Sequence, residues 1–231
     1  MKKKLLILIE LNNLFKMQNI KAIIFDIDDT LVQTIQCKWL ALKATAKKYY
    51  NLKITDTQLK KFWGTPFQAM LTGVFSNVDD FEIIKKRYIE ISRNFPMRPH
   101  RGAVAAIKSL KKHYLIAALT SSSRSVILKD LEDSKYNLKD FYFIQTSEDT
   151  PYHKPDSEVF IPTLVKLKKL KINPENIIYV GDAIRDYEAA KKARFNFIGV
   201  LSGLTSKKEF ETAGLNSKNI ISNLSKLNMV I

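Results

Sequence analysis

The sequence predicts an α/β fold in which helices cover a parallel β-sheet and an all-helical subdomain interrupts the chain after the first strand. Three observations predict this architecture. Five short runs are almost continuously hydrophobic, as expected for strands whose two faces are both covered. Helical patterns alternate with the later runs, which favours right-handed crossovers between parallel strands. The segment between the first two runs is longer than one crossover requires and contains only helical patterns.

The predicted core is a Rossmann-like sheet with its helices, formed by residues 20–33 and 95–231. We expect its strands at 22–27, 114–119, 141–144, 177–180 and 195–200. Between them, apolar residues with helical spacing predict helices at 102–112, 124–131, 156–170 and 184–193. This alternation is typical of a sheet with helices on its two faces.

The inserted subdomain is expected at 34–94. From Asp28 to Tyr114 the chain has no convincing strand pattern. Helical patterns occur instead at 34–50, 57–62, 66–75 and 81–91. Pro96 and Pro99 then mark the return to the core.

The composition excludes a disordered chain and leaves two interpretations of the charge. Hydrophobic residues make up 45% of the 231 residues, which is enough for a sizeable core. The formal net charge of +15 could indicate a nucleic-acid partner. The basic residues are dispersed, however, and no long block interleaves them with aromatic residues. We therefore favour a lysine-rich solvated surface, whose positive field would still attract small anionic substrates.

The N-terminal region and the cysteine content bear on location. Cys37 is the only cysteine, so no internal disulfide is possible, which fits a reducing compartment. Residues 1–19 are expected to form an N-terminal extension, whose apolar run 5–9 is too short for a signal peptide or a membrane-spanning helix. We expect a cytoplasmic protein without a membrane partner, as a monomer or a homodimer.

Polar residues follow the predicted strands where each strand ends. Those that follow the first, second, third and fourth runs are, in this order, Asp26 and Asp28, Thr120 and Ser121, Lys154, and Asp182 and Asp186. Ligands of open parallel sheets bind beyond the carboxyl ends of the strands. We therefore expect these four segments to meet at one edge of the sheet.

The chemistry of this set favours a cation and a phosphoryl group. Two carboxylates about 4 Å apart repel by roughly 4 kcal/mol at an effective dielectric constant of about 20. Oxygen ligands at strand ends suit Mg²⁺, which keeps several waters and bridges to phosphate. Lys154 and Thr120 supply a fixed positive charge and a hydroxyl donor, as phosphoryl transfer requires. A carboxylate can also act as the covalent nucleophile in such a reaction.

These segments resemble the motifs of the haloacid dehalogenase-like superfamily. The resemblance lies in 25–32, in Thr120 at a strand end, in 153–160, and in the Gly-Asp-x-x-x-Asp pattern of 181–186. The closest pattern is the phosphoglycolate phosphatase-like branch, which carries a helical cap after the first motif. That branch often has glycine where this chain has Asp29, and aspartate tolerates unusual turn conformations better than most residues.

The resemblance implies a role for each matching residue. Asp26 would attack phosphorus, and Asp28 would protonate the leaving oxygen and then activate water. Mg²⁺ would be held by Asp26, the backbone carbonyl of Asp28 and Asp182, with Asp186 in support. Thr120 and Lys154 would bind the phosphoryl group, and Ser121 would contact the substrate beside them. In the insertion, the loop 63–66 joins two predicted helices, so Trp63 and Thr65 are expected to face the substrate.

The leading hypothesis is therefore a Mg²⁺-dependent phosphatase that hydrolyses a small phosphorylated metabolite through an aspartyl-phosphate intermediate. A phosphomutase or a pyrophosphatase on the same scaffold is the closest alternative. Dehalogenation is disfavoured, because Asp28 supplies an acid/base that this reaction does not need. Phosphonate cleavage would need a cap lysine, for which Lys38 and Lys43 are available. A non-catalytic protein that binds a phosphorylated ligand is the alternative from another class.

Overall fold

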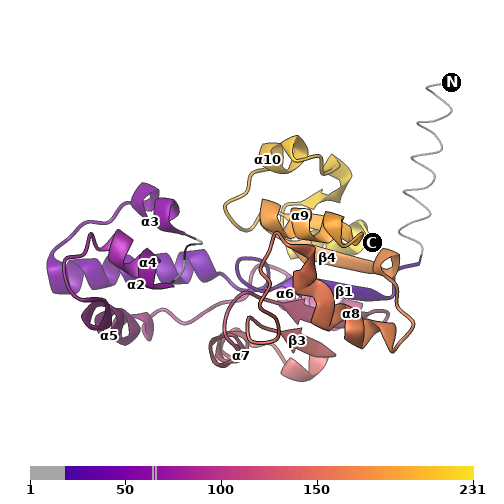
Figure 1. Ribbon diagram of the computed structural model, residues 1–231, viewed down its shortest axis with the longest axis horizontal. Coiled ribbons are helices and arrows are strands. Elements are labelled where there is room, and N and C mark those ends of the chain that lie inside the picture. Colours follow the sequence, from indigo (N-terminus) through magenta and orange to yellow (C-terminus); the bar gives the residue numbers. More distant parts are fainter. Residues whose placement is uncertain (1–18, 64, 66) are drawn as a thin grey trace. The chain divides into compact units, whose positions relative to one another are not determined.

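The computed structural model describes residues 19–63, 65 and 67–231, and within them the predicted α/β fold is confirmed. One six-stranded sheet has the order β3-β2-β1-β4-β5-β6, and all neighbouring strands are parallel (Figure 1). The strands are β1 (Ala22–Asp26), β2 (Leu115–Leu119), β3 (Phe143–Gln145), β4 (Ile177–Gly181), β5 (Asn196–Val200) and β6 (Ile220–Ile221). The five predicted runs correspond to β1–β5, whereas β6, with 2 residues, is too short for a hydrophobic pattern to predict it.

The strand order reverses at β1. The chain proceeds from β1 through β2 to β3 on one side, and then from β4 through β5 to β6 on the other. β1 and β4 are neighbours in the sheet, with Phe25 opposite Val180. This is the topological switch point, where the loops after adjacent strands diverge and leave room for a ligand.

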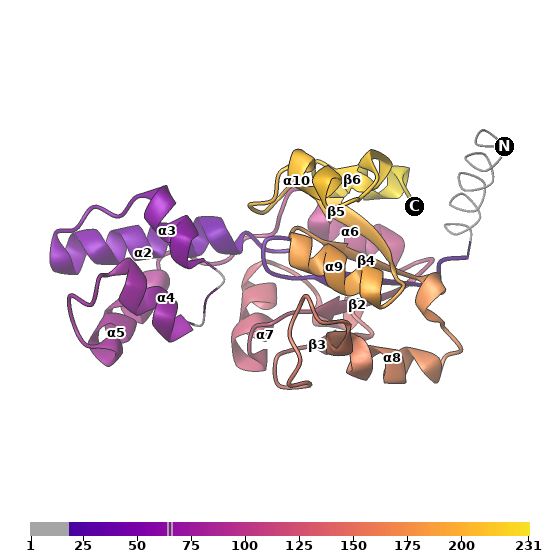
Figure 2. The same cartoon turned by 45° about the horizontal axis from the view of Figure 1, so that its top comes forward.

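Helices cover both faces of the sheet, which explains the continuous hydrophobic runs (Figure 2). Successive residues of β1 point to opposite faces. Ile23 and Phe25 pack in a cluster with α6 (Ala103–Leu110) and α7 (Arg124–Asp133). Ile24 packs in a second cluster with α8 (Ile161–Lys168), α9 (Ile184–Lys192) and α10 (Lys207–Thr212).

The predicted helix at 156–170 is divided in the structure. A 3₁₀ turn, η2 (Ser157–Phe160), precedes α8, and Pro162 lies in the first turn of α8. Proline has no backbone N–H, so it suits a helix start and not a helix interior. The remaining 3₁₀ segments are η1 (Leu138–Asp140), η3 (Pro174–Asn176), η4 (Ser217–Asn219) and η5 (Leu224–Met229).

A second compact unit comprises Gln33–Arg98. Its helices are α2 (Thr34–Tyr50), α3 (Asp56–Phe62), α4 (Phe67–Val74) and α5 (Phe81–Ser92), and they share a hydrophobic core of their own. The unit extends beyond the predicted end at 94, because Phe95 packs against that core and the Cys37 thiol donates to the carbonyl of Pro96. The N–H of Gln33 donates to the carbonyl of Arg98 at 2.8 Å, so the two ends of the unit are paired.

The segment before β1 is tied to the segment before its neighbour β4. The amide of Asn176 donates to the carbonyl of Asn19 at 2.9 Å, just before β1 begins. Apart from Asn19, the predicted N-terminal extension 1–19 lies outside the described residues. None of the described helices is both long and apolar enough to cross a lipid bilayer.

Candidate active site

The candidate site lies at the carboxyl ends of β1, β2 and β4. Asp26 is the last residue of β1, Thr120 follows β2, and Asp182 follows β4. All three are buried, with 3%, 3% and 8% of their surface exposed. The parallel register places them together, because Asp26 pairs with Leu119 and the β4 partner of Phe25 is Val180.

The turn after β1 has a conformation that explains Asp29. The N–H groups of Leu31 and Val32 both donate to the carbonyl of Ile27, at 2.9 and 3.0 Å. Within this turn Asp29 has a φ of 59°, which is the left-handed region that glycine enters most easily. Aspartate is among the few other residues that visit this region, so Asp29 can stand where the resembling branch often has glycine.

Three buried carboxylates form a cluster that could hold a metal ion. Oxygen atoms of Asp26, Asp182 and Asp186 all lie within 4.8 Å of one another. The hydroxyl of Thr30 donates to Oδ1 of Asp182 at 3.1 Å, and the N–H of Ala183 donates to Oδ2 of Asp186 at 3.0 Å. These donors fix the carboxylates from outside, which leaves the cluster preorganised for a cation.

Two glycines allow the acids to approach the backbone. A Cβ atom on Gly203, in the loop after β5, would lie 1.8 Å from Oδ2 of Asp182. A Cβ atom on Gly181 would lie 2.7 Å from the side chain of Asp186. Any larger residue at either position would therefore displace a member of the acidic cluster.

The electrostatics of the cluster call for additional positive charge. Burial, and then the neighbouring Asp186, raise the pKa of Asp182 to about 8. Burial also raises the pKa of Asp26 well above its ordinary value, although the Lys154 ammonium opposes this shift. A divalent cation among the three acids would favour their ionised forms, and carboxylate oxygens are the ligands that Mg²⁺ prefers.

Lys154 reaches the cluster from the loop between β3 and η2. Its Nζ lies 2.5 Å from Oδ1 of Asp26 and 2.6 Å from Oδ1 of Asp186. Burial alone would lower the pKa of Lys154, but these two carboxylates raise it well above its ordinary value. Lys192 of α9 holds the loop, since its Nζ donates to the carbonyl of Pro155 at 3.0 Å. The side chain of Lys154 is thus a fixed positive charge.

Two hydroxyl groups hold Asp28. They belong to Thr120 and to Ser122, which the sequence did not single out. The hydroxyl of Thr120 donates to Oδ2 of Asp28 at 2.8 Å, and the hydroxyl of Ser122 donates to the same oxygen at 3.0 Å. The N–H of Ser122 also donates to Thr120 Oγ1 at 2.9 Å. Ser121, which we predicted as a substrate contact, is exposed between them. The side chain of Asp28 lies outside the three-acid group.

Thr30, Ser122 and Tyr179 are the polar neighbours that sequence reasoning missed. Tyr179 lies within β4, and its hydroxyl contacts Lys154 and Asp186. The signals for the three were weak. Thr30 lies in the first motif, Ser122 belongs to a run of three serines, and Tyr179 is a single polar group within an apolar strand.

The two site residues predicted in the insertion belong to the helical unit. The ring of Trp63 meets that of Trp39 edge-on, with centroids 6.0 Å apart. Thr65 is exposed, and its hydroxyl donates to the carbonyl of Phe62 at 2.7 Å. Gly64 and Pro66 of the same loop lie outside the described residues.

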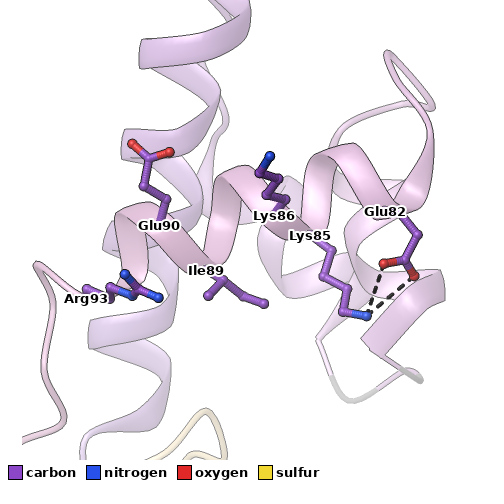
Figure 3. A pocket seen from close by; sticks show the side chains of 6 residues that line it. All are labelled: Glu82, Lys85, Lys86, Ile89, Glu90 and Arg93. Carbon is purple, nitrogen blue, oxygen red and sulfur yellow. Dashed lines mark hydrogen bonds and ion pairs between the residues drawn. The ribbon is translucent and has the colours of Figure 1, made fainter.

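A separate hollow lies on the surface of α5 and has a different character. Figure 3 shows its six lining side chains on one helix: Glu82, Lys85, Lys86, Ile89, Glu90 and Arg93. Three of its charged side chains are already paired, since Lys85 contacts Glu82 at 3.2 Å and Glu90 contacts Lys48 at 2.9 Å. It contains none of the predicted site residues and no cluster of buried acids.

Comparisons with known proteins indicate a family and a fold. A family model described as haloacid dehalogenase-like hydrolase matches residues 23–200. The chain is 26% identical to the pyrophosphatase PpaX of Oceanobacillus iheyensis, over 76% of this chain and 80% of that protein. It is 27% identical to a phosphoglycolate phosphatase of Aquifex aeolicus, over 75% and 81%. In fold it resembles a HAD hydrolase of family IA, variant 3, from Entamoeba histolytica, with a TM-score of 0.70, 19% identity and coverage of 91% and 99%.

Proposed function

Because the chain belongs to the haloacid dehalogenase-like hydrolase family, we propose that it is a Mg²⁺-dependent phosphatase that acts on a small phosphorylated metabolite. One observation carries this proposal. The carboxylate of Asp26, at the end of the central strand, contacts the buried ammonium of Lys154 and shares its cluster with two further acids. This arrangement combines an anionic nucleophile, a fixed cation and a candidate metal site within one polar cluster.

The names of the relatives support phosphoryl chemistry and favour a second candidate substrate. One relative is named a phosphoglycolate phosphatase and another a pyrophosphatase, and each is matched over at least 80% of its length. Hydrolysis of a phosphate monoester and hydrolysis of pyrophosphate share the same transferred group and differ in the leaving group. Inorganic pyrophosphate is therefore the specific alternative to a phosphate monoester.

In the first half of the proposed reaction, Asp26 is the nucleophile. One of its carboxylate oxygens forms a bond to phosphorus while the bond from phosphorus to the ester oxygen breaks. Asp28 gives its proton to that leaving oxygen. Lys154 would contact the transferring phosphoryl group, whose negative charge needs fixed donors. The Thr120 hydroxyl, whose single proton is donated to Asp28, would bind that group on releasing Asp28 to Ser122. The product of this half-reaction is an aspartyl phosphate on Asp26.

In the second half, Asp28 is the base. It takes a proton from a water molecule, whose oxygen attacks phosphorus and displaces Asp26, so that inorganic phosphate leaves and both side chains return to their starting forms. The same carboxyl group must therefore face the leaving oxygen and then the water. The two hydroxyl donors on its Oδ2, from Thr120 and Ser122, support this role because they restrict its rotation.

The acidic cluster fits Mg²⁺. Asp26, Asp182 and Asp186 would hold it, with Asp186 either in direct contact or orienting the others, together with the backbone carbonyl of Asp28. When bound, the ion would neutralise the carboxylates and the substrate phosphoryl oxygens, which would otherwise repel each other. Burial and the neighbouring acids raise the pKa of Asp182 to about 8, and a divalent cation at this cluster would favour its ionised form.

The helical unit is the proposed source of substrate selection. The core residues contact only the phosphoryl group and the metal, which all phosphate esters share. A unit inserted directly after the first motif could act as a cap, exclude water and contact the rest of the substrate. Trp63 and Thr65 are the residues that we propose for this contact, since they belong to the loop between α3 and α4.

A phosphate-release screen tests the proposal. The purified protein is given phosphoglycolate, sugar phosphates, pyrophosphate and p-nitrophenyl phosphate, each with Mg²⁺ and with a chelator. We expect release from at least one compound with Mg²⁺ and loss of that release with chelator. Hydrolysis at full rate in the metal-free protein would refute the metal site. Binding of these compounds without any release would favour the non-catalytic alternative.

A further inference from the structure

Tyr179 is a buried phenol that the proposed reaction does not use. Its exposed fraction is 0%, although it carries a polar group within the central part of the sheet. A buried hydroxyl without a partner costs about 1–3 kcal/mol, so its partners indicate its purpose. Both partners belong to the candidate active site.

The register of the sheet explains how Tyr179 reaches the site. Tyr179 lies opposite Ile24 in the pairing of β4 with β1. Ile24 and Tyr179 belong to the same hydrophobic cluster, and Asp26, two residues after Ile24, points to that same face. The side chains of Tyr179 and Asp26 therefore lie on the same face of the sheet, where Lys154 contacts both.

The hydroxyl of Tyr179 bridges two charged groups. It lies 3.3 Å from Nζ of Lys154 and 3.3 Å from Oδ1 of Asp186. An ammonium only donates and a carboxylate only accepts, so the hydroxyl must accept from Lys154 and donate to Asp186. Lys154 has three N–H donors, and its three acceptors are Asp26, Asp186 and Tyr179. Each donor of the ammonium therefore has a partner.

We propose that Tyr179 is a positioning residue, which holds the Lys154 ammonium and the Asp186 carboxylate in fixed geometry for phosphoryl transfer. This inference rests on the proposed function of the same site. When a phosphoryl oxygen accepts from Lys154, the ammonium must release one of its present acceptors. The hydroxyl of Tyr179 and the carboxylate of Asp186 would then keep it from rotating away.

The packing of the Tyr179 ring allows a test that separates the positioning role from a purely structural role. The Tyr179 ring packs against Phe160 and Phe197, with centroids 5.1 and 6.1 Å apart. Phenylalanine would preserve these contacts and remove only the hydroxyl. Tyr187 offers a matched control, because it is also buried in this cluster and its ring packs 5.5 Å from Phe197. Among the described residues, the Tyr187 hydroxyl makes no hydrogen bond to Lys154 or to the acids of the site.

The test compares Tyr179→Phe with Tyr187→Phe in the Mg²⁺-loaded protein. We expect Tyr179→Phe to lower kcat about tenfold, which is the effect of one hydrogen bond to a charged group, with less than about a twofold change in KM. Tyr187→Phe should leave both constants within about twofold. Equal effects of the two variants would assign Tyr179 a packing role and overturn the proposal.

A double-mutant cycle tests whether Tyr179 acts through Lys154. In a Lys154→Ala background, Tyr179→Phe should lower kcat by clearly less than about tenfold, because one of the two groups that it positions is absent. A full tenfold loss in that background would show that the hydroxyl acts independently and would overturn the proposal. Thermal unfolding of each variant checks that the comparison is made on folded protein.

A binding experiment separates this inference from the proposed function. Orthovanadate resembles the five-coordinate phosphoryl group, and its binding in the presence of Mg²⁺ can be measured by calorimetry without turnover. We expect Tyr179→Phe, and not Tyr187→Phe, to raise its Kd about tenfold. If no compound is hydrolysed but this difference is found, the proposed function fails and the role of Tyr179 stands. If hydrolysis is found and the two variants bind orthovanadate equally, the proposed function stands and the role of Tyr179 fails.

Discussion

Nζ of Lys154 lies 2.5 Å from Oδ1 of Asp26, although the two residues are 128 positions apart in the chain. This contact joins the loop after β3 to the end of β1, and both side chains are almost fully buried. Such a pair stabilises the ionised form of the carboxylate against the opposing effect of burial. Five predictions follow from this pair and its neighbours.

Asp26→Asn should reduce turnover to background, by at least about a thousandfold. The amide has nearly the same shape as the carboxylate but no anionic oxygen to attack phosphorus. Phosphate release with Mg²⁺ measures the effect, and circular dichroism checks the fold. Asp133→Asn, at an exposed acid that pairs with Lys129 at 2.6 Å, is the matched control and should retain activity. A folded Asp26→Asn protein with substantial turnover would refute the assignment of the nucleophile.

Lys154→Ala should depress all substrates alike, whereas changes in the helical unit should alter their ranking. The lysine would stabilise charge on the phosphoryl group, which every substrate shares. Thr65→Ala or Trp63→Phe should instead change the ratio of kcat/KM between two good substrates, by about threefold or more. The division of roles is wrong if that ratio shifts with Lys154 and stays constant in both variants of the helical unit.

Lys154→Ala should also destabilise the protein. Removing one partner of a buried ion pair typically lowers the free energy of unfolding by about 3–5 kcal/mol, because the other charge is left uncompensated. Denaturant unfolding provides the measurement, with Lys129→Ala as the exposed control. The side chain of Lys129 is 72% exposed, so its variant should change stability by less than about 1 kcal/mol.

Gly203→Ala should weaken metal binding. The added Cβ would lie 1.8 Å from Oδ2 of Asp182, so the carboxylate or the loop must move. We expect the Kd for Mg²⁺, measured by calorimetry, to rise about tenfold or more, within the range for changes that reorient a ligand. Ser202→Ala is the neighbouring control, because among the described residues its buried hydroxyl has no hydrogen-bond partner. Equal Kd values in the two variants would contradict the role of Asp182.

The stability of the metal-free protein should fall as pH rises from about 5 to about 8. An unfolded aspartate has a pKa of about 3.9, whereas Asp182 in the folded protein has a pKa of about 8. Between these values the folded state binds more protons, so stability falls by up to about 1.4 kcal/mol per pH unit for this group. Its contribution is complete below the unfolded pKa and is lost as pH rises through the folded value.

Urea unfolding at pH 6 and pH 8 with chelator measures this dependence. Mg²⁺ binds the ionised acid, so its stabilising effect should be larger at pH 8 than at pH 6. Asp182→Asn should flatten the dependence in the metal-free protein. If the slope is unchanged in Asp182→Asn, the titration belongs to other groups.

The elements of the core could be predicted from the sequence because parallel strands are buried on both faces. Each of β1–β5 is nearly continuously apolar, and each is followed by its polar loop. Since parallel strands end at the same edge of a sheet, the convergence of Asp26, Lys154 and Asp182 could be expected from the strand direction alone. Their expected closeness is confirmed by the contacts in the structure.

What the sequence did not reveal depends on side-chain geometry. That Thr120 and Ser122 donate to the same oxygen of Asp28 follows from the fold of a loop, which no periodicity describes. Tyr179 has the pattern of an ordinary strand residue, because only the tertiary structure places its hydroxyl beside Lys154. The segment 95–98 joins the helical unit through the Cys37 thiol, the packing of Phe95 and the hydrogen bond from Gln33 to Arg98, which proline positions could not predict.

The pairing of Gln33 with Arg98 marks a junction at which the helical unit could be exchanged. The bridge between Val32 and Pro99 and the hydrogen bond from His100 N–H to the carbonyl of Leu31, at 2.8 Å, continue the same antiparallel ribbon into the core. Within the core, Val32 and Pro99 are therefore neighbours, whatever the length of the chain between them. An exchange of everything beyond this ribbon would leave the registers of β1 and β2 untouched. If the helical unit selects the substrate, as proposed, chimaeras joined at these positions should keep the site residues of the core and acquire the substrate preference of the new unit.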